Sequence, residues 1–291
     1  MRTLLFTAAL STLALPSLAE QKPALPAQEE ADYVRWVEDK SGDSLQVAVV
    51  SFTHPGGQKL DLVGAVHIGD KAYYEELNKR FKGYDAVLYE LVGGPMPKTR
   101  QEKEARRAGR DSSSLAWVGT MHEKLKQSLA LASQMDEVDY SPENFVHADM
   151  SLEEFQKSRE EKNESFLGLM VKAWLVQSEL QGQSDTSKDL AQLMKILLSS
   201  DSATELKRMV GSQFHMVEEL VTGIEGSEGS VIIGARNDVA LKVLAQQLLT
   251  DKKRFAIFYG AAHLPDMERK LRAAGWKKQR TEWLKAWNLP E

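Results

Sequence analysis

The chain has 291 residues, 42% of them hydrophobic and 27% charged, and a formal net charge of −5. This composition is typical of a globular protein and excludes a collagen-like repeat, a disordered chain and a multi-span membrane protein. The acidic balance disfavours nucleic acid as a partner, because nucleic-acid binding needs clustered Lys and Arg. The chain contains no cysteine, which excludes disulfides, thiolate metal sites and cysteine nucleophiles. Any metal would therefore be held by His, Asp or Glu.

The N-terminus has the pattern of a secretory signal peptide over residues 1–19. Arg2 precedes an apolar stretch from Leu4 to Leu15, and Ser17 and Ala19 place small residues before a cleavage point. The alternative is a single membrane anchor, but a helix needs roughly 20 apolar residues to span a bilayer. We therefore expect a periplasmic or secreted protein with no stable membrane anchor after cleavage.

The first part of the mature chain predicts a leader followed by alternating strands and helices. Residues 20–44 are expected to form the leader, and residues 45–66 read as a β-hairpin. Asp70 can cap a helix over 71–81, where apolar residues recur at helical spacing. The apolar stretch 86–92 that follows is typical of a buried strand.

The middle of the chain, about 96–224, is rich in Ala, Leu, Met, Glu, Lys and Gln and is expected to be an all-helical insertion. Ser151 and Glu154 form a capping box that opens one of its helices. The pattern then returns to alternating elements: a helix from residue 239, a strand over 254–259, a helix near Pro265 and one or two closing strands over 276–287.

These elements predict one α/β domain over 45–291. Its central mixed sheet is formed by the N- and C-terminal portions, and the large all-helical insertion interrupts it. The notable feature of the two portions is a shared motif, Gly64-Ala-Val-His67 and Gly260-Ala-Ala-His263. Each motif ends an apolar strand and precedes a helix, so each histidine is expected at the carboxyl edge of the sheet, where α/β proteins bind ligands. The alternative for each is a capping or core histidine.

Glu90 is the next candidate site residue. It ends the apolar run Val87-Leu-Tyr-Glu90, and an isolated charge there is too costly to bury unpaired. In a parallel βαβ unit its strand end would lie beside His67. The alternatives are a glutamate that reaches solvent and a structural salt bridge.

Two further pairs accompany these residues. Arg236 and Asn237 open a helix directly after an apolar run, where a guanidinium can clamp a carboxylate or stabilise an oxyanion. An ordinary helix-start charge or Asn cap is an equally good interpretation. His147 and Asp149 could add a ligand pair, although a capping or surface role is expected for them.

Together, His67, Glu90 and His263 offer a metal site with nitrogen and oxygen ligands, which suits Zn²⁺, Mn²⁺, Co²⁺ or Fe²⁺. Three protein ligands leave open positions where a bound water can be activated and a carbonyl polarised. The chain has no HExxH pair, P-loop, dinucleotide glycine fingerprint or Gly-x-Ser-x-Gly elbow.

This set of motifs resembles the TraB/GumN family, whose animal relatives are the Tiki proteins. The matching segments, in the same order, are Leu62–His67, Tyr89-Glu90, Arg236-Asn237 and Tyr259–Pro265. The resemblance implies an α/β core with a helical insertion and a hydrolase-like site. Tiki proteins are divalent-metal-dependent proteases, which implies Mn²⁺ or Co²⁺, whereas the more distantly similar erythromycin esterases show no clear need of metal.

The first functional hypothesis is an exported, metal-dependent hydrolase of the peptidase or amidase kind, with a peptide or small molecule as substrate. His67 and His263 would hold the metal, and Glu90 would be a ligand or general base. Arg236 would steady the transition-state oxyanion or the substrate carboxylate, and Asn237 would orient it. The second is a metal-independent, esterase-like hydrolase with His67 as general base. The third is a non-catalytic periplasmic binding or assembly factor.

Overall fold

The computed structural model describes most of the two outer portions of the chain and part of the middle. The expected signal peptide, residues 1–19, and most of the expected insertion lie outside the described residues. Within the described residues, no helix combines the length and the apolar character needed to cross a membrane. The described residues are 33–40, 42–97, 102, 129–161, 201–212 and 231–289.

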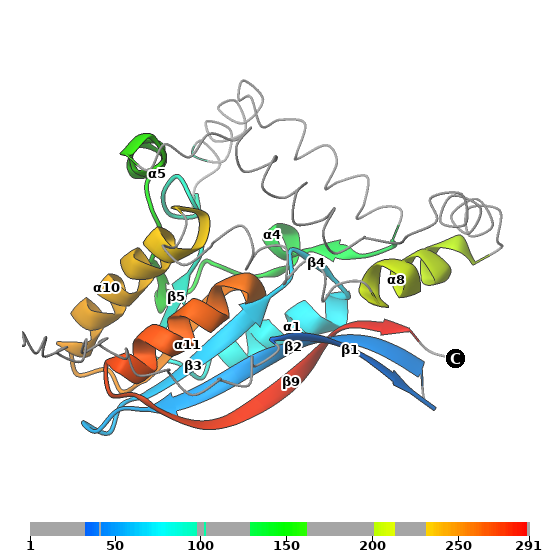
Figure 1. Ribbon diagram of the computed structural model, residues 1–291, viewed down its shortest axis with the longest axis horizontal. Helices are drawn as coiled ribbons and strands as arrows, with labels where there is room; N and C mark the ends of the chain where they lie inside the picture. Colours follow the sequence, from blue (N-terminus) through cyan, green and yellow to red (C-terminus); the bar gives the residue numbers. More distant parts are fainter. Residues whose placement is uncertain are drawn as a thin grey trace, which may run out of the picture. The chain divides into compact units, whose positions relative to one another are not determined.

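The centre of the fold is a mixed sheet of seven strands in the order β1-β2-β3-β8-β5-β7, with β9 paired to β2 (Figure 1). Its strands are β1 (Val34–Asp39), β2 (Gly42–Thr53), β3 (Lys59–Ala65), β5 (Ala86–Tyr89), β7 (Phe145–His147), β8 (Arg254–Gly260) and β9 (Lys277–Leu289). A second, two-stranded sheet pairs β4 (Ile68–Gly69) with β6 (Ala132–Ser133).

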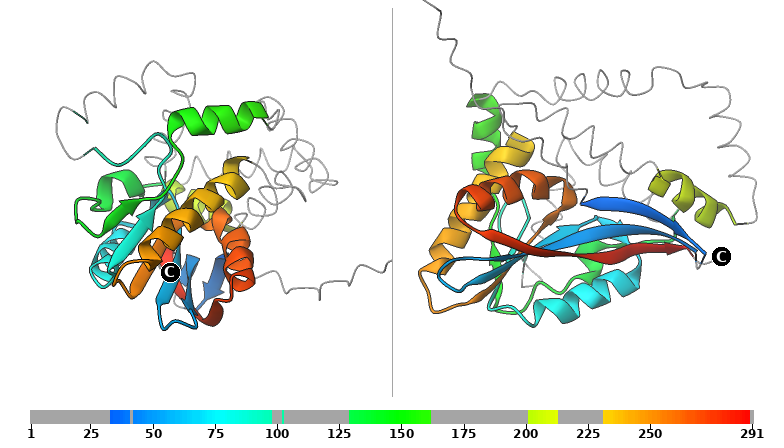
Figure 2. Two further views of the ribbon diagram at one scale, coloured as in Figure 1. Left: turned by 90° about the vertical axis from the view of Figure 1, so that its left-hand side faces the viewer. Right: turned by 60° about the horizontal axis from the view of Figure 1, so that its bottom comes forward.

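Helices cover both faces of the main sheet, as the two views of Figure 2 show: α1 lies on one face and α11 on the other. Helix α10 packs beside α11 and against β5. The helices are α1 (Lys71–Phe81), α4 (Gln134–Glu137), α5 (Leu152–Glu161), α8 (Ser202–Ser212), α10 (Arg236–Leu248) and α11 (Leu264–Ala273). A π-turn, η1 (Val231–Ala235), leads into α10, and a 3₁₀ turn, η2 (Ala261–His263), leads into α11.

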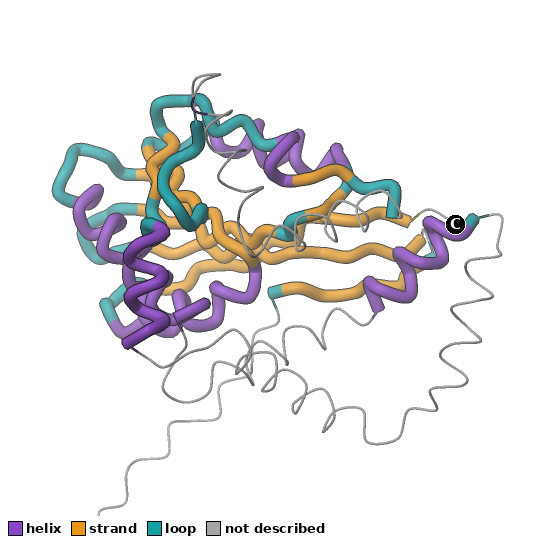
Figure 3. The backbone as a smooth tube through the Cα atoms, turned by 90° about the horizontal axis from the view of Figure 1, so that it is seen from above, coloured by secondary structure: helices purple, strands orange, loops and turns teal. Residues whose placement is uncertain are grey.

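The sheet, whose strands lie side by side in Figure 3, has an antiparallel half and a parallel half. Strand β2 pairs antiparallel with β1, β3 and β9. Strands β3, β8, β5 and β7 pair parallel to one another, in that order. The carboxyl ends of these four strands therefore meet at one edge, which is where ligand sites form in open α/β sheets.

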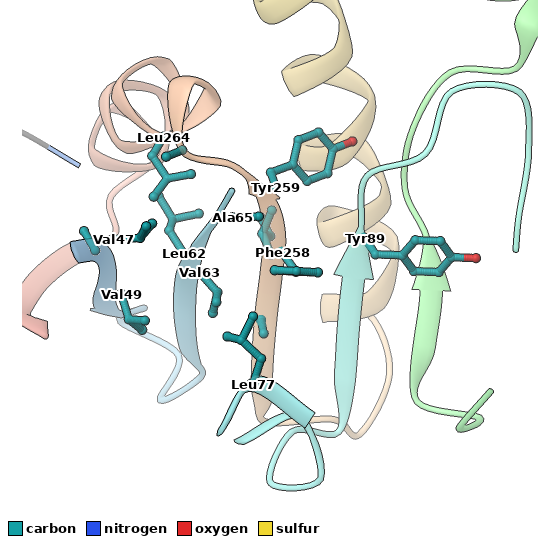
Figure 4. Close-up of a cluster of buried hydrophobic side chains, with 14 of the residues drawn as sticks. Val47, Val49, Leu62, Val63, Ala65, Leu77, Tyr89, Phe258, Tyr259 and Leu264 are labelled. Carbon is teal, nitrogen blue, oxygen red and sulfur yellow. The ribbon is translucent and has the colours of Figure 1, made fainter. Parts of the chain in front are cut away.

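The hydrophobic core is continuous across both faces of the parallel half. Successive residues of a strand point to opposite faces of its sheet. Figure 4 shows this alternation in β3: Leu62 is on the side of Leu264 from α11, and Val63 is close to Leu77 from α1. All four side chains are fully buried. The strand ends are thus held on a rigid, two-sided core.

Several expectations of the sequence are confirmed. The hairpin over 45–66 corresponds to β2 and β3, and the helix over 71–81 is α1. The Ser151–Glu154 capping box is formed: the Ser151 N–H donates to Glu154 Oε2 at 2.8 Å, and the Glu154 N–H donates to Ser151 Oγ at 3.1 Å. The closing segment is a single long strand, β9.

Other boundaries differ from the prediction. Strand β1 and the start of β2 lie in the stretch 20–44 that was expected to be a leader. The described part of 96–224 contains strands β6 and β7 as well as helices, and β7 joins the main sheet, so this part is not all-helical. Asp70 occupies the N-cap position of α1, but its carboxylate makes no cap hydrogen bond and instead accepts from Lys207 Nζ and the Asn288 N–H.

Candidate functional site

The four parallel strands each place one polar side chain at the same edge of the sheet. His67 lies two residues after β3, and His263 ends the 3₁₀ turn that follows β8. Glu90 directly follows β5, and Asp149 lies two residues after β7. Because these strands are neighbours in the sheet, residues separated by up to 196 positions in the sequence (67 to 263) are brought to one edge.

Arg236, in the first turn of α10, connects the carboxylates of this edge. Its Nε and Nη2 donate to the two oxygens of Asp149 at 2.9 and 2.6 Å, the forked geometry that suits a guanidinium. Its Nη2 also donates to Glu90 Oε1 at 2.6 Å, and its Nη1 lies 3.5 Å from His263 Nε2. Arg236 and Asp149 are both buried. One buried cation is therefore shared by two carboxylates.

Glu90 is held in its ionised form. Its Oε2 accepts the Gly260 N–H at 2.7 Å, and its Oε1 lies 3.7 Å from His263 Nε2. Burial opposes ionisation, but the charges of His263, Arg236 and His67, together with the Gly260 N–H, outweigh it and lower the pKa of Glu90 to about 2. Glu90 therefore carries its negative charge at any physiological pH.

His263 is held in its neutral form. Burial lowers the pKa of its imidazole to about 4, more strongly than the Glu90 carboxylate raises it. At pH 7 the ring is uncharged, and Arg236 is then the cation that balances Glu90. Burial alone would also lower the pKa of Arg236, but its contacts with Asp149 and Glu90 raise it above its usual value.

Asn237 positions His263 and is itself fully buried. Its Oδ1 lies 2.7 Å from His263 Nδ1, and its Nδ2 donates to the His263 carbonyl oxygen at 3.1 Å. These contacts give Asn237 a positioning role towards His263, and its expected orienting role stays a prediction. Asn237 contacts the histidine, and through Nδ2 it also reaches Asp266 at 2.8 Å.

His67 is the exposed member of the site. Its carbonyl oxygen accepts the Gln134 N–H at 2.9 Å, which ties its loop to the start of α4. Two tyrosines of α1 hold the preceding backbone: the Tyr73 hydroxyl donates to the Gly64 carbonyl oxygen at 2.9 Å, and the Tyr74 hydroxyl donates to that of Val66 at 3.0 Å. The His67 charge acts on both Glu90 and His263.

The sheet order corrects one neighbour relation. Glu90 was expected beside His67, because β5 follows β3 through a single helix. In the structure β8 lies between them, and the Glu90 N–H donates to the Phe258 carbonyl oxygen at 3.2 Å. Glu90 therefore neighbours His263.

Asp149 is the site residue that sequence reasoning missed. It was expected to cap a helix or lie on the surface, but it is buried against Arg236. Its neighbour His147 stays at the margin, where its Nε2 lies 2.7 Å from the Leu91 carbonyl oxygen. The available signal was the short apolar stretch Phe145-Val146, which places Asp149 just after a strand.

The fit of a divalent metal depends on three donors. His67, Glu90 and His263 supply the nitrogen and oxygen atoms that Zn²⁺, Mn²⁺ and Co²⁺ accept. However, in the part of the chain that the structure describes, no group of three or more His, Asp or Glu side chains is arranged to hold a metal ion. Arg236 Nη2 moreover forms an ion pair with Glu90 Oε1 at 2.6 Å, on the oxygen that a metal ion would need. The donor types fit a metal, but their arrangement as it stands does not.

The glycines of the two motifs are expected to differ in their tolerance of alanine. A Cβ on Gly64 would lie 2.6 Å from Val47 Cγ1 and 3.1 Å from the Ala48 carbonyl oxygen, whereas a Cβ on Gly260 would meet nothing closer than Glu90 Oε2 at 3.4 Å. Gly64→Ala should therefore lower the free energy of unfolding by about 1–3 kcal/mol through overpacking. Gly260→Ala should change it by less than about 1 kcal/mol. Urea unfolding of both variants checks this, and equal costs would contradict it.

Comparison with models of protein families finds no match to this chain, and comparison with curated proteins finds none either. The TraB/GumN resemblance therefore stays a prediction made from short, collinear motifs.

Proposed function

We propose that this protein is an exported hydrolase that cleaves an amide or ester bond at the edge formed by β3, β8, β5 and β7. The observation that carries the proposal is the convergence of an ionised Glu90 and a neutral His263, with Oε1 and Nε2 3.7 Å apart. Buried titratable groups with strongly shifted pKa values at the carboxyl edge of a sheet are typical of active sites. The TraB/GumN resemblance implies the same class of reaction.

In the first candidate mechanism His67 is the general base. Glu90 and His263 both bind protons weakly at neutral pH, as their lowered pKa values indicate, so neither is suited to take a proton from water. His67 is exposed and close enough to feel the charge of Glu90. It would take a proton from water as the water oxygen attacks the carbonyl carbon. It would then return the proton to the leaving nitrogen or oxygen.

Glu90 and its partners would support this step. The negative charge of Glu90 interacts electrostatically with His67 and would stabilise the imidazolium that forms there during proton transfer. Arg236 and the Gly260 N–H hold Glu90 in place, and Asp149 holds Arg236. His263 Nε2 would accept a hydrogen bond from the attacking water. Arg236 thus balances charge at Glu90, and its direct contact with the substrate oxyanion remains a prediction.

The second candidate is the metal-dependent hydrolase, with His67, Glu90 and His263 as ligands. The nitrogen and oxygen donors of these residues and the TraB/GumN resemblance support it, but the present arrangement of the donors does not. A bound Zn²⁺, Mn²⁺ or Co²⁺ would polarise the carbonyl and lower the pKa of a bound water. Arg236 would then have to leave Oε1, and His67 would have to approach.

The test combines metal analysis with hydrolysis of p-nitrophenyl esters and aminoacyl p-nitroanilides, before and after exhaustive chelation. For the first candidate, activity should survive chelation, and Glu90→Gln and His67→Ala should each lower kcat/KM roughly 10²- to 10⁴-fold. For the second, chelation should abolish activity and Mn²⁺, Co²⁺ or Zn²⁺ should restore it. His54→Ala is the matched control, because His54 lies in the turn at the opposite end of β3.

The variants also discriminate the alternatives. Equal metal content in the wild type, His67→Ala and His263→Ala would contradict the metal ligand assignment. Activity that is unchanged in Glu90→Gln would contradict both hydrolase mechanisms. Absence of turnover with and without added metals would instead favour the binding or assembly factor.

A further inference from the structure

The Asn237 side chain connects the site to the first turn of α11. Its Nδ2 donates to two oxygens, the His263 carbonyl at 3.1 Å and Asp266 Oδ2 at 2.8 Å. Its Oδ1 lies 2.7 Å from His263 Nδ1. Asp266 in turn pairs with Arg269 and, at 2.8 Å, with Lys270 Nζ. The carboxylate is therefore held on both oxygens.

These partners determine which way the Asn237 amide faces. A carbonyl oxygen and a carboxylate oxygen can only accept hydrogen bonds, so the NH₂ group must face them. The amide oxygen then faces His263 and requires a proton on Nδ1. On the other side of the ring, Arg236 Nη1 lies 3.5 Å from Nε2 and can only donate, so Nε2 accepts through its lone pair and carries no proton. That lone pair faces Arg236 Nη1 and the Glu90 carboxylate.

We propose that Asp266 is a positioning residue of the hydrolytic site: acting through Asn237, it fixes His263 in the tautomer that leaves Nε2 unprotonated beside Glu90. The role of Asp266 in catalysis rests on the proposed hydrolase function. The effect of Asp266 on the His263 tautomer does not depend on that function. Metal-binding and catalytic histidines commonly owe their tautomer to the partner of their other nitrogen. Here the partner of Nδ1 is the Asn237 amide, and Asp266 orients that amide.

Without Asp266 the amide keeps one of its two acceptors, the His263 carbonyl oxygen. A flipped amide would then present NH₂ to Nδ1 and oxygen to a single carbonyl, and Nε2 would carry the proton. Nε2–H would then face Arg236 Nη1 at 3.5 Å, a cation that cannot accept it, with the Glu90 Oε1 acceptor further away at 3.7 Å. The expected result is a mixture of tautomers and a loss of the acceptor that Nε2 provides.

The experiment measures the His263 tautomer directly by ¹⁵N NMR of protein labelled at histidine, at pH 7 in the presence of a chelator. His263→Gln assigns the His263 signals by their disappearance. The wild type should show a protonated Nδ1 and an unprotonated Nε2. Asp266→Ala should introduce the form protonated at Nε2, and Asp266→Asn, which retains an acceptor oxygen towards Asn237, should restore the wild-type pattern.

Asp238→Ala is the matched control. Asp238 pairs with the same Lys270, at 2.6 Å, and hydrogen-bonds neither Asn237 nor His263 among the described residues. Its loss should leave the tautomer unchanged. With a substrate that the protein hydrolyses, Asp266→Ala should lower kcat roughly 10- to 100-fold, the usual cost of removing a supporting residue, with little change in KM. Asp266→Asn should recover most of the lost kcat.

Three results would overturn the proposal: a wild-type His263 protonated at Nε2, an unaltered tautomer in Asp266→Ala, or an equal tautomer change in Asp238→Ala. The wild-type spectrum decides the first even if Asp266→Ala does not fold. A confirmed tautomer with no hydrolysis in any assay would remove the hydrolase proposal and leave the positioning role of Asp266 intact.

Discussion

Replacing Arg236 with methionine is expected to lower the free energy of unfolding by about 3–5 kcal/mol, the usual cost of removing one partner of a buried ion pair. Arg236 is buried, and its Nε and Nη2 hold the carboxylates of Asp149 and Glu90 at 2.6–2.9 Å. Its removal leaves two carboxylates without their shared cation. Urea unfolding monitored by circular dichroism would measure the change.

Two further variants make this result specific. Arg272→Met removes an arginine that pairs with the buried Glu268, but Lys278 Nζ remains 3.0 Å from the same carboxylate. Because Arg272 is also half-exposed, its loss should cost less than about 1 kcal/mol. Combining Arg236→Met with Asp149→Asn should recover part of the loss, since one uncompensated charge disappears. Similar costs for Arg236→Met and Arg272→Met would contradict the shared-cation interpretation.

The elements that could be predicted from the sequence are those with strong local signals. The hairpin of β2 and β3 has β-forming residues on both sides of a His54-Pro-Gly turn, and α1 repeats its apolar residues at helical spacing. The two Gly-x-x-His motifs and Glu90 stand out because a polar residue ends an apolar strand. A buried charge in such a place demands a partner, and the structure supplies Arg236.

The order of the strands could not be predicted in the same way. Strand β8 inserts between β3 and β5, so that Glu90 neighbours His263 and not His67. That order depends on which long-range pairing buries more apolar surface. A local sequence pattern carries no information about it.

Asp149 was missed for a related reason. Strand β7 has only three residues and follows a segment whose composition favours helices. Its position depends on pairing with β5, and the role of Asp149 depends on an arginine 87 residues away. The role of Asn237 was likewise set by tertiary contacts. The motif Arg-Asn indicated a functional pair, but only the fold shows that its amide faces His263.

The protein is expected to lose about 3 kcal/mol of stability between pH 6.5 and pH 4 because of His263 alone. The pKa of its imidazole falls from the usual value near 6.5 to about 4 in the folded state. Below pH 6.5 the unfolded chain therefore binds a proton that the folded chain does not. The stability that neutral His263 contributes is complete above about pH 6.5. It falls by about 1.4 kcal/mol per pH unit below that and is lost as the pH falls through 4.

His263→Gln separates this contribution from that of the carboxylates. Glu90 has a pKa lowered to about 2, so its own contribution is present above about pH 4.3 and is lost only at lower pH. Urea unfolding of the wild type at pH 7, 5.5 and 4, with a chelator present, should give a steep decline, and His263→Gln should flatten it while lowering the stability at pH 7. Parallel pH profiles for the two proteins would mean that folding does not lower the pKa of His263, so that the folded protein is protonated there at pH 5.5 and 4. Arg236 and an imidazolium would then both face Glu90, and His263 Nε2 would offer no lone pair to a water or a metal ion.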